Sequence, residues 1–458
     1  MMFQNWIFLP FFLIAYAVYL AVKRTRLKNL WILIASYVFY GWWNPLFLLL
    51  IGYATVFDYI MVALMEAGRR KKLWLTLAVV NNLALLSFFK YGYFVTENIN
   101  ALLSKLGSSY AIELSGILLP VGISFYVFKS IGYIVDYYRG KVEREKSFVR
   151  HAVFVSFFPL LIAGPIERAG NLLPQIRNTP RLTPQDIADG FSLFIVGLFK
   201  KVALADCLAV YVNKVYSVPD EYNAPALLLA TFAFTWQIYF DFSGYSDMAR
   251  GVARLMGFRI MLNFNHPYLA VSIGDFWHRW HISLSTWFRD YFYIPLGGNR
   301  KGSFNTYRNL FLTFVISGFW HGAAWTFVIW GALHGLGMVL TRSIERSTLY
   351  KEKMPKLLKQ LFVFIFVSFA WIFFRASSWD DACLIITRIF SSGLTDPMFP
   401  LLFVFLIMSV WLYQFAYESP AQRLLNLAPV RIGAVIMMIL YLAVCTGSTG
   451  QAFIYNQF

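Results

Sequence analysis

The sequence contains little charge for its length. Charged residues make up only 14% of the 458 residues, and hydrophobic residues make up 59%. Soluble domains carry about 25% charged residues. Several stretches of about 20 residues lack charge, which is the length needed to cross the hydrocarbon core of a bilayer. These proportions exclude an ordinary soluble protein and predict an all-α polytopic membrane protein.

Cysteine is also scarce. The three cysteines, Cys207, Cys383 and Cys445, lie far apart and form no CxxC pair. This spacing excludes a disulfide framework and a cysteine metal site, so we expect buried apolar thiols. A cleavable signal peptide is not expected either, because residues 1–10 carry no basic residue and the basic residues follow the first apolar stretch.

Acidic residues are fewer than basic ones, with 23 Asp and Glu against 40 Lys and Arg, which gives a net charge of +17. The basic residues cluster in short connections between apolar runs rather than in a soluble domain. Such loops remain on the cytoplasmic side of the membrane. We therefore predict that the loops at 23–28, 69–72, 139–150 and 342–359 are cytoplasmic and that the N-terminus is outside.

Apolar runs predict most of the organisation. Membrane spans are expected at residues 6–22, 30–40, 46–65, 73–89, 117–135, 224–240, 360–374, 399–416 and 432–444. Residues 151–163 are too few to cross and predict a re-entrant or buried segment. Residues 309–341 predict two helical pieces hinged near Ser317, Gly318 and Gly322. Together these features indicate one integral membrane domain over residues 1–458 with about 10–12 crossings.

One histidine lies inside an apolar segment. His321 falls between Leu310 and Leu340, in the string Ser317 to Ala323. An ionisable group at membrane depth is costly, so its default interpretation is functional. A neutral imidazole in a low-dielectric site is a competent base near pH 7. The alternative, a packing histidine bonded between helices, stays open at this point.

A second aromatic patch holds two more histidines. His278 and His281 lie three residues apart, which on a helix would place them on one face, with Asp275 another three residues earlier. No HExxH motif is present and carboxylates are few, so we expect no metal. His281 is the more attractive polar partner for His321, and His278 is expected to face headgroups.

Acidic residues in aromatic surroundings form a third candidate group. Asp241 and Asp247 either line a polar cavity or bond to neighbouring backbone and arginines, and Asp206 could form an ion pair that orders helices. Neither a GxxxxGK[ST] phosphate loop nor a GxSxG nucleophile elbow occurs.

These strings together resemble the membrane-bound O-acyltransferase family, in its bacterial subgroup of alginate and peptidoglycan O-acetylation and teichoic-acid D-alanylation membrane subunits. The matching strings are residues 35–40, 119–126, 163–165, 239–248, 280–298 and 320–322. The resemblance implies that His321 is the catalytic histidine. His281 occupies a second polar position that is variably His, Asn or Asp in the family, which commonly has arginine at the place of His278. We add Trp320, Trp280, Asp241, Asp206 and Arg289 as candidates that support the site or line a tunnel.

The resemblance also implies a fold and an activity. The fold would be a ring of tilted transmembrane helices around a central tunnel, in the bacterial cytoplasmic membrane. The activity would be transfer of an acetyl group from a cytoplasmic donor, acetyl-CoA, with no tightly bound cofactor, to an extracytoplasmic hydrolase-like partner that modifies a polysaccharide. D-alanyl transfer and lipid acylation remain alternatives within enzymes. A permease with a histidine proton relay is an alternative of another class.

Overall fold

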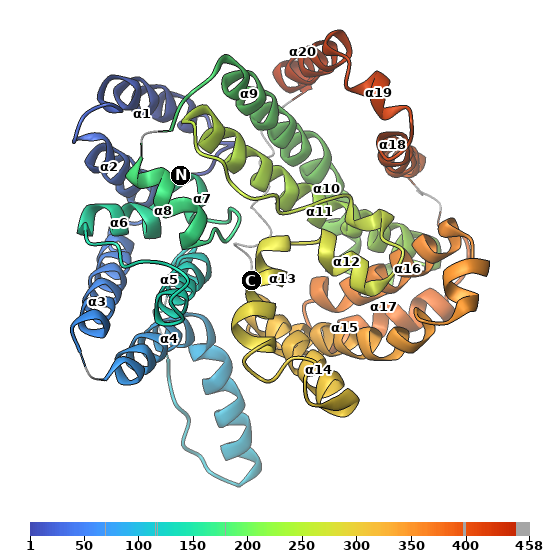
Figure 1. Cartoon of the computed structure of the whole chain (residues 1–458). Coiled ribbons are helices and arrows are strands. Elements are labelled where there is room, and N and C mark those ends of the chain that lie inside the picture. Colours follow the sequence, from blue (N-terminus) through green and yellow to red (C-terminus); the bar gives the residue numbers. More distant parts are fainter. Residues whose placement is uncertain (69, 115, 117, 179, 397–399, 446–458) are drawn as a thin grey trace. The chain divides into compact units, whose positions relative to one another are not determined.

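The computed structural model describes residues 1–68, 70–114, 116, 118–178, 180–396 and 400–445 (Figure 1). Over these residues the chain forms twenty α-helices and no strand, with short 3-10 and π-helical turns between some of them. This confirms the predicted all-α polytopic membrane protein. Arg69, Ile117 and Phe399, which belong to a predicted loop and two predicted spans, lie outside the described residues.

The chain divides into two compact units. Unit 1 comprises residues 1–194 and 248–261, and unit 2 comprises residues 195–247 and 262–458. Two helices, α9 (Pro184–Phe199) and α11 (Ala224–Leu255), contribute to both units. The sequence predicts a single membrane domain, and the structure distinguishes these two units within it.

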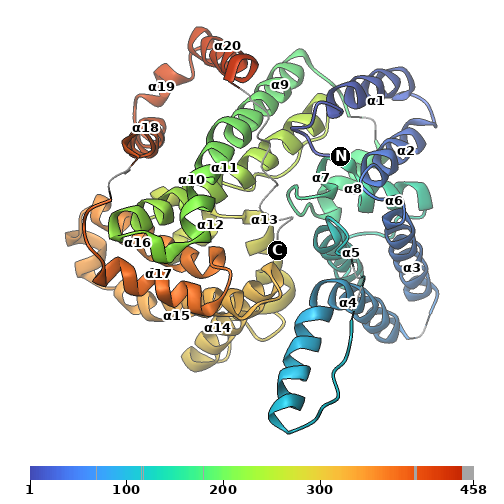
Figure 2. The same ribbon diagram turned by 180° about the vertical axis from the view of Figure 1, so that it is seen from behind.

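Unit 1 contains the first five predicted spans. Its remaining helices are α1 (Phe8–Val22), α2 (Lys28–Gly41), α3 (Phe47–Ala67), α4 (Lys71–Lys105), α5 (Ile123–Tyr138), α6 (Phe148–Ser156), α7 (Phe158–Leu161) and α8 (Ala169–Arg177). Helix α4 continues well beyond the predicted end at residue 89, because the polar residues that follow do not include a proline that would break it. Its later half and the segment after it project from the other helices of unit 1 in Figures 1 and 2.

The short segment at residues 151–163 is buried throughout, as predicted. It is split into α6 and α7 at Phe157, just before Pro159, which suits the start of a new helix but not the interior of an old one. The backbone N–H of Phe158, freed by the break, donates to Ser36 Oγ at 3.2 Å. Gly122, at φ 79°, packs against the backbone of Leu161, where a Cβ would not fit.

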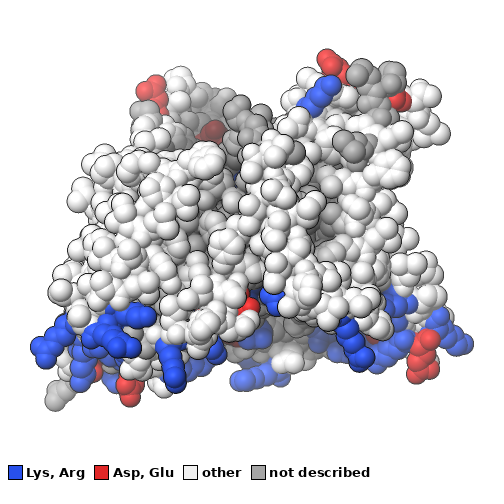
Figure 3. All heavy atoms as spheres, turned by 90° about the horizontal axis from the view of Figure 1, so that it is seen from above, with Lys and Arg blue, Asp and Glu red and all other residues white. Residues whose placement is uncertain are grey.

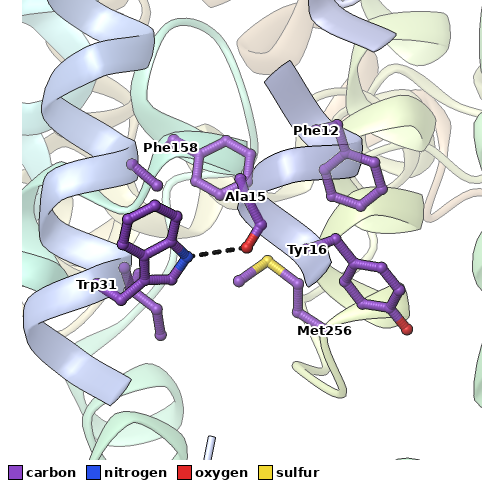
Figure 4. A pocket seen from close by; sticks show the side chains of 8 residues that line it. Phe12, Ala15, Tyr16, Trp31, Phe158 and Met256 are labelled. Atoms are coloured by element: carbon purple, nitrogen blue, oxygen red, sulfur yellow. Dashed lines mark hydrogen bonds between the residues drawn. The ribbon is translucent and has the colours of Figure 1, made fainter. Parts of the chain in front are cut away.

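A small pocket lies in unit 1 beside α1 and α2 (Figure 4). Trp31 closes one side, and its Nε1–H donates to the carbonyl oxygen of Ala15 at 2.9 Å. Apolar and aromatic residues make up the lining, which comprises Phe12, Ala15, Tyr16, Trp31, Ile32, Ala35, Phe158 and Met256. The lining contains no carboxylate, histidine or lysine, so this pocket is not a candidate for acid–base chemistry.

Three described helices are long and apolar enough to cross a membrane by length and composition, namely α3, α4 and α16 (Lys356–Arg375). Shorter apolar helices occur at Phe8–Val22, Phe403–Tyr417 and Ala428–Val444. Figure 3 shows wide uncharged surface with lysine and arginine side chains gathered at its edge. The predicted number of 10–12 crossings stays a prediction.

Unit 2 carries the later predicted spans. Besides α16 it contains α10 (Asp206–Ser217), α12 (Ile273–Arg279), α13 (Ile282–Phe288), α14 (Gly302–His321), α15 (Trp325–Ile344), α17 (Trp379–Ser391), α18 (Leu401–Tyr417), α19 (Gln422–Leu425) and α20 (Ala428–Cys445). The expected burial of the cysteines is wrong for the two whose side chains are described. Cys207 is exposed and Cys383 is half-buried, because each lies on a helix face that its neighbours do not fully cover.

Helices α14 and α15 form a tight antiparallel pair in unit 2. Helix α14 ends where a hinge was predicted, at Gly322, which adopts an extended backbone. The predicted hinge at Gly318 is wrong, because Gly318 lies inside α14 and faces the backbone of Phe327 and Gly331. Small residues let membrane helices approach closely, so Gly318 is a packing position.

Replacing Gly318 with alanine should lower the stability of this pair by about 1–3 kcal/mol, because the added Cβ would overlap the backbone of α15. Gly52→Ala is the matched control, since no atom lies within 4 Å of a Cβ built there. Thermal melting of the purified variants in detergent would measure the difference. Equal melting temperatures for Gly318→Ala and the wild type would contradict the close packing.

Candidate active site

Two histidines predicted to act together contact the same indole ring within unit 2. The centroid of the Trp320 ring lies 6.4 Å from that of His281 and 4.8 Å from that of His321. All three side chains are buried. The structure therefore brings together His281, Trp320 and His321, which lie about 40 residues apart in the sequence.

His321 is the last residue of α14, at the helix break. Its ring contacts Trp330 of α15 at 5.1 Å and Phe374 of α16 at 5.4 Å between centroids. With Trp320 these rings surround the imidazole on several sides and exclude bulk water. A polar group enclosed in this way interacts strongly with any dipole or charge that enters beside it.

His281 lies between helices rather than on one. Helix α12 ends at Arg279 and α13 begins at Ile282, and His281 adopts φ 41° and ψ 54°, in the left-handed region. The predicted common helix face for His278 and His281 is therefore wrong, because the helix ends between them. His278 is exposed, and its Nδ1 lies 2.7 Å from the carbonyl oxygen of Gly274, one helical turn earlier.

Asn263 holds the His281 ring, and sequence reasoning missed it. Its Oδ1 lies 3.1 Å from His281 Nδ1 and accepts from the backbone N–H of Ser283 at 3.2 Å. The backbone N–H of Ile282 donates to the backbone carbonyl oxygen of Asn263 at 2.9 Å. These bonds pair the segment around Asn263 with the start of α13, a tertiary contact that no spacing in the sequence reveals.

A third buried histidine extends the row of rings. The Trp330 ring lies 5.1 Å from His321 and 4.9 Å from His334, between centroids. Trp277 Nε1–H donates to His334 Nδ1 at 3.3 Å. His334 was not predicted, although it carries the signal that marks His321, a histidine within the apolar segment at 310–340.

Asp206 and Asp241 both form ion pairs with the same lysine, Lys201. Lys201 Nζ lies 2.8 Å from a carboxylate oxygen of Asp206 and 2.7 Å from one of Asp241, and all three side chains are buried. The adjacent Lys200 binds Asp247 at 2.7 Å. The ion pair expected for Asp206 is thus present, and Asp241 shares it. Both lysines come from the π-helical turn Lys200–Ala205, or η1, which faces α11.

The two remaining candidates, Trp280 and Arg289, differ in whether they lie near the histidines. Trp280 is buried against Phe264 at 5.0 Å and Trp371 at 5.2 Å between ring centroids. Because Phe264 also contacts His281, Trp280 supports the wall behind that ring. Arg289 is 57% exposed and binds its neighbour Asp290 at 2.8 Å, so the structure does not bring it to the histidines.

The chemistry available at this site is that of neutral bases and hydrogen-bond donors in an aromatic enclosure. Within the described part of the chain, no group of three or more His, Cys, Asp or Glu side chains is placed to hold a metal ion. Asp275, considered above with His278, instead binds Arg279 at 2.9 Å. Imidazoles in such a setting can move a proton during group transfer.

Residues 143–378 match the model of MBOAT, the membrane-bound O-acyltransferase family. This range is more than half of the chain and includes both His281 and His321. The chain belongs to the membrane-bound O-acyltransferase family. The resemblance drawn from the sequence is confirmed, and the protein is an O-acyltransferase of the membrane.

Relatives with curated names agree with this assignment. The probable alginate O-acetylase AlgI of Pseudomonas putida is 46% identical over 391 residues, which cover 84% of this chain and 79% of the relative. The peptidoglycan O-acetyltransferase of Helicobacter pylori is 37% identical, over 82% of this chain and 76% of the relative. The teichoic acid D-alanyltransferase of Bacillus subtilis is 29% identical, over 56% of this chain and 68% of the relative.

Proposed function

We propose that this membrane-bound O-acyltransferase takes an acetyl group from cytoplasmic acetyl-CoA for O-acetylation of an extracytoplasmic polysaccharide. The observation that carries the proposal is the pair of buried histidines that both contact the Trp320 ring, inside the region that matches the family. The relatives named for O-acetylation align at higher identity and over more of the chain than the relative named for D-alanyl transfer. An alginate-like polymer is the first acceptor to test.

In the proposed reaction an acceptor hydroxyl attacks the carbonyl carbon of the acetyl thioester. The new C–O bond forms as the C–S bond breaks, the hydroxyl proton passes to a base, and the leaving thiolate takes up a proton. His321 would act as the base or as a donor to the carbonyl oxygen. His281 would orient His321 or polarise the carbonyl.

The proposal includes passage of the acetyl group through the membrane to a hydrolase-like extracytoplasmic partner. The helix break between His321 and Trp325 supports it, since irregular backbone at membrane depth is tolerated where it is buried in protein or lines a cavity. Gly322 is not the place to block such a tunnel, because the Phe327 ring occupies the space where a side chain would go. A tryptophan there would disturb folding before it blocked passage.

We also propose that the protein lies in the bacterial cytoplasmic membrane with its N-terminus outside. Cysteine introduced at Arg70 should then resist a membrane-impermeant maleimide on intact cells, and cysteine at Ser108 should react, in a background without the native cysteines. Ser108 is exposed and serves better than Gly107, whose φ of 79° disfavours a side chain. The opposite labelling pattern would invert the orientation.

Transfer of a label tests the activity itself. Purified protein in vesicles is given acetyl-CoA labelled in the acetyl group on the cytoplasmic side, with an alginate-type polymer and the hydrolase-like partner on the other. Covalent label on the polymer or the partner supports the proposal. Movement of intact labelled solute without covalent transfer would favour a permease, and transfer only from a D-alanyl carrier would favour the D-alanylating relatives.

A further inference from the structure

The orientation of the Asn263 amide is fixed by its neighbours. The backbone N–H of Ser283 can only donate, and it meets the Asn263 side chain at 3.2 Å. The atom that it meets is therefore the amide oxygen. The amide nitrogen then points to Ser246, and it donates to Ser246 Oγ at 3.2 Å. Exchanging the two amide atoms would place N–H against N–H at Ser283.

This orientation determines the tautomer of His281. Nδ1 lies 3.1 Å from Asn263 Oδ1, a distance at which two lone pairs would repel and an N–H bonds well. Nδ1 therefore carries the proton of the neutral ring, and Nε2 carries a lone pair. The side chain is completely buried, and Nε2 has no hydrogen-bond partner among the described residues.

His334 in the same row of rings has the opposite tautomer. The indole N–H of Trp277 is a donor only, so His334 Nδ1, at 3.3 Å, accepts. The proton of the neutral His334 ring is then on Nε2. The two buried histidines therefore differ in which nitrogen carries hydrogen, and each assignment follows from a partner that cannot reverse its role.

We infer that Asn263 is a positioning residue that fixes His281 as the Nδ1–H tautomer, so that its Nε2 is the proton acceptor of the active site. Resting on the proposed function, this inference excludes one of the two roles given to His281, polarisation of the carbonyl by the neutral ring. A neutral ring with a bare Nε2 cannot donate to a thioester carbonyl, but it can accept a proton from the attacking hydroxyl or from an N–H of His321. The imidazolium formed keeps its Nδ1–H bond to Asn263, now charge-assisted.

Nitrogen-15 NMR of histidine-labelled protein in lipid bilayers reads the tautomers directly, because protonated and bare ring nitrogens resonate far apart. The chain has six histidines, so the spectrum is small. We expect an Nδ1–H pattern that disappears in His281→Asn, and an Nε2–H pattern that disappears in His334→Gln. An Nε2–H pattern for His281 in the wild type would overturn the inference, whatever the activity of the protein.

Two substitutions at Asn263 separate positioning from packing. Asn263→Leu has similar size but no acceptor, and it should shift His281 away from the pure Nδ1–H form and lower acetyl transfer by about 10²-fold. Asn263→Asp keeps an oxygen for Nδ1–H and for Ser283, so it should retain the protonated Nδ1 and most of the activity. Ser246→Ala, which leaves Oδ1 untouched, is the control and should preserve the His281 pattern.

A folded Asn263→Leu protein with an unchanged His281 spectrum and unchanged activity would show that Asn263 only packs, and would overturn the inference. Failure of the proposed function gives a different result. The NMR patterns would then appear as expected while no variant, nor the wild type, transfers acetyl groups. The two proposals can thus fail separately.

Discussion

Replacing His321 with alanine should reduce acetyl transfer by about 10²-fold to 10⁴-fold while the protein stays folded. The loss is expected because the imidazole is the ionisable group in an enclosure made by Trp320, Trp330 and Phe374. Without it the helix break loses the imidazole to which the proposed reaction gives the role of base or of donor to the carbonyl oxygen. The measurement is the rate of transfer from labelled acetyl-CoA, taken together with monodispersity in detergent.

His151→Ala is the matched control for this substitution. His151 is also fully buried, against Tyr59 and Tyr133, but it lies in unit 1 and outside the proposed machinery. Removing its ring should cost packing energy of the same kind and leave transfer near the wild-type rate. Wild-type transfer by a folded His321→Ala protein would remove His321 from the mechanism.

Replacing Lys201 with methionine should destabilise the protein by about 3 kcal/mol or more, because two buried carboxylates would lose the ammonium group that they share. Breaking a buried ion pair from one side leaves charge without compensation, and the low-dielectric surroundings make that costly. We expect a large fall in the yield of folded protein and in its melting temperature.

Neutralising the carboxylates as well should restore folding. In the triple variant Lys201→Met, Asp206→Asn, Asp241→Asn no buried charge is left at this position, so its melting temperature should rise well above that of Lys201→Met. Recovery of acetyl transfer along with folding would show that the aspartates only support the structure. A folded triple variant without activity would instead show that Lys201 or one of its two aspartates has a role in the reaction. If Lys201→Met melts like the wild type, the ion pairs do not hold the helices.

Much of this fold follows from composition alone. Helices α3 and α16 are predicted because uncharged apolar runs of membrane length form helices when backbone groups must be satisfied internally. The extension of α4 is missed, since the change from apolar to polar residues marks the edge of the predicted span but not the end of the helix. Gly318 is misread as a hinge because glycine serves close packing as well as bending.

The site is only partly readable from the sequence. His321 is recognisable from the cost of an ionisable group among apolar residues, and His334 carries the same signal. The sequence does not reveal that His281 lies between two helices, because the residue pattern on both sides of it is compatible with one continuous helix. Asn263 and Lys201 gain their roles from tertiary contacts, to His281 in one case and to two aspartates of different helices in the other.

The left-handed backbone conformation at His281 limits which residue types are suited to this position. With φ at 41°, most side chains would strain the chain, whereas asparagine, aspartate and histidine are several-fold enriched in this region. These are the three residues that the family resemblance assigns to the position. A glutamate or lysine side chain can also move a proton, but both residues are disfavoured at this backbone conformation. The backbone of the turn between α12 and α13 therefore restricts which residues can occupy position 281, independently of the chemistry that the reaction requires.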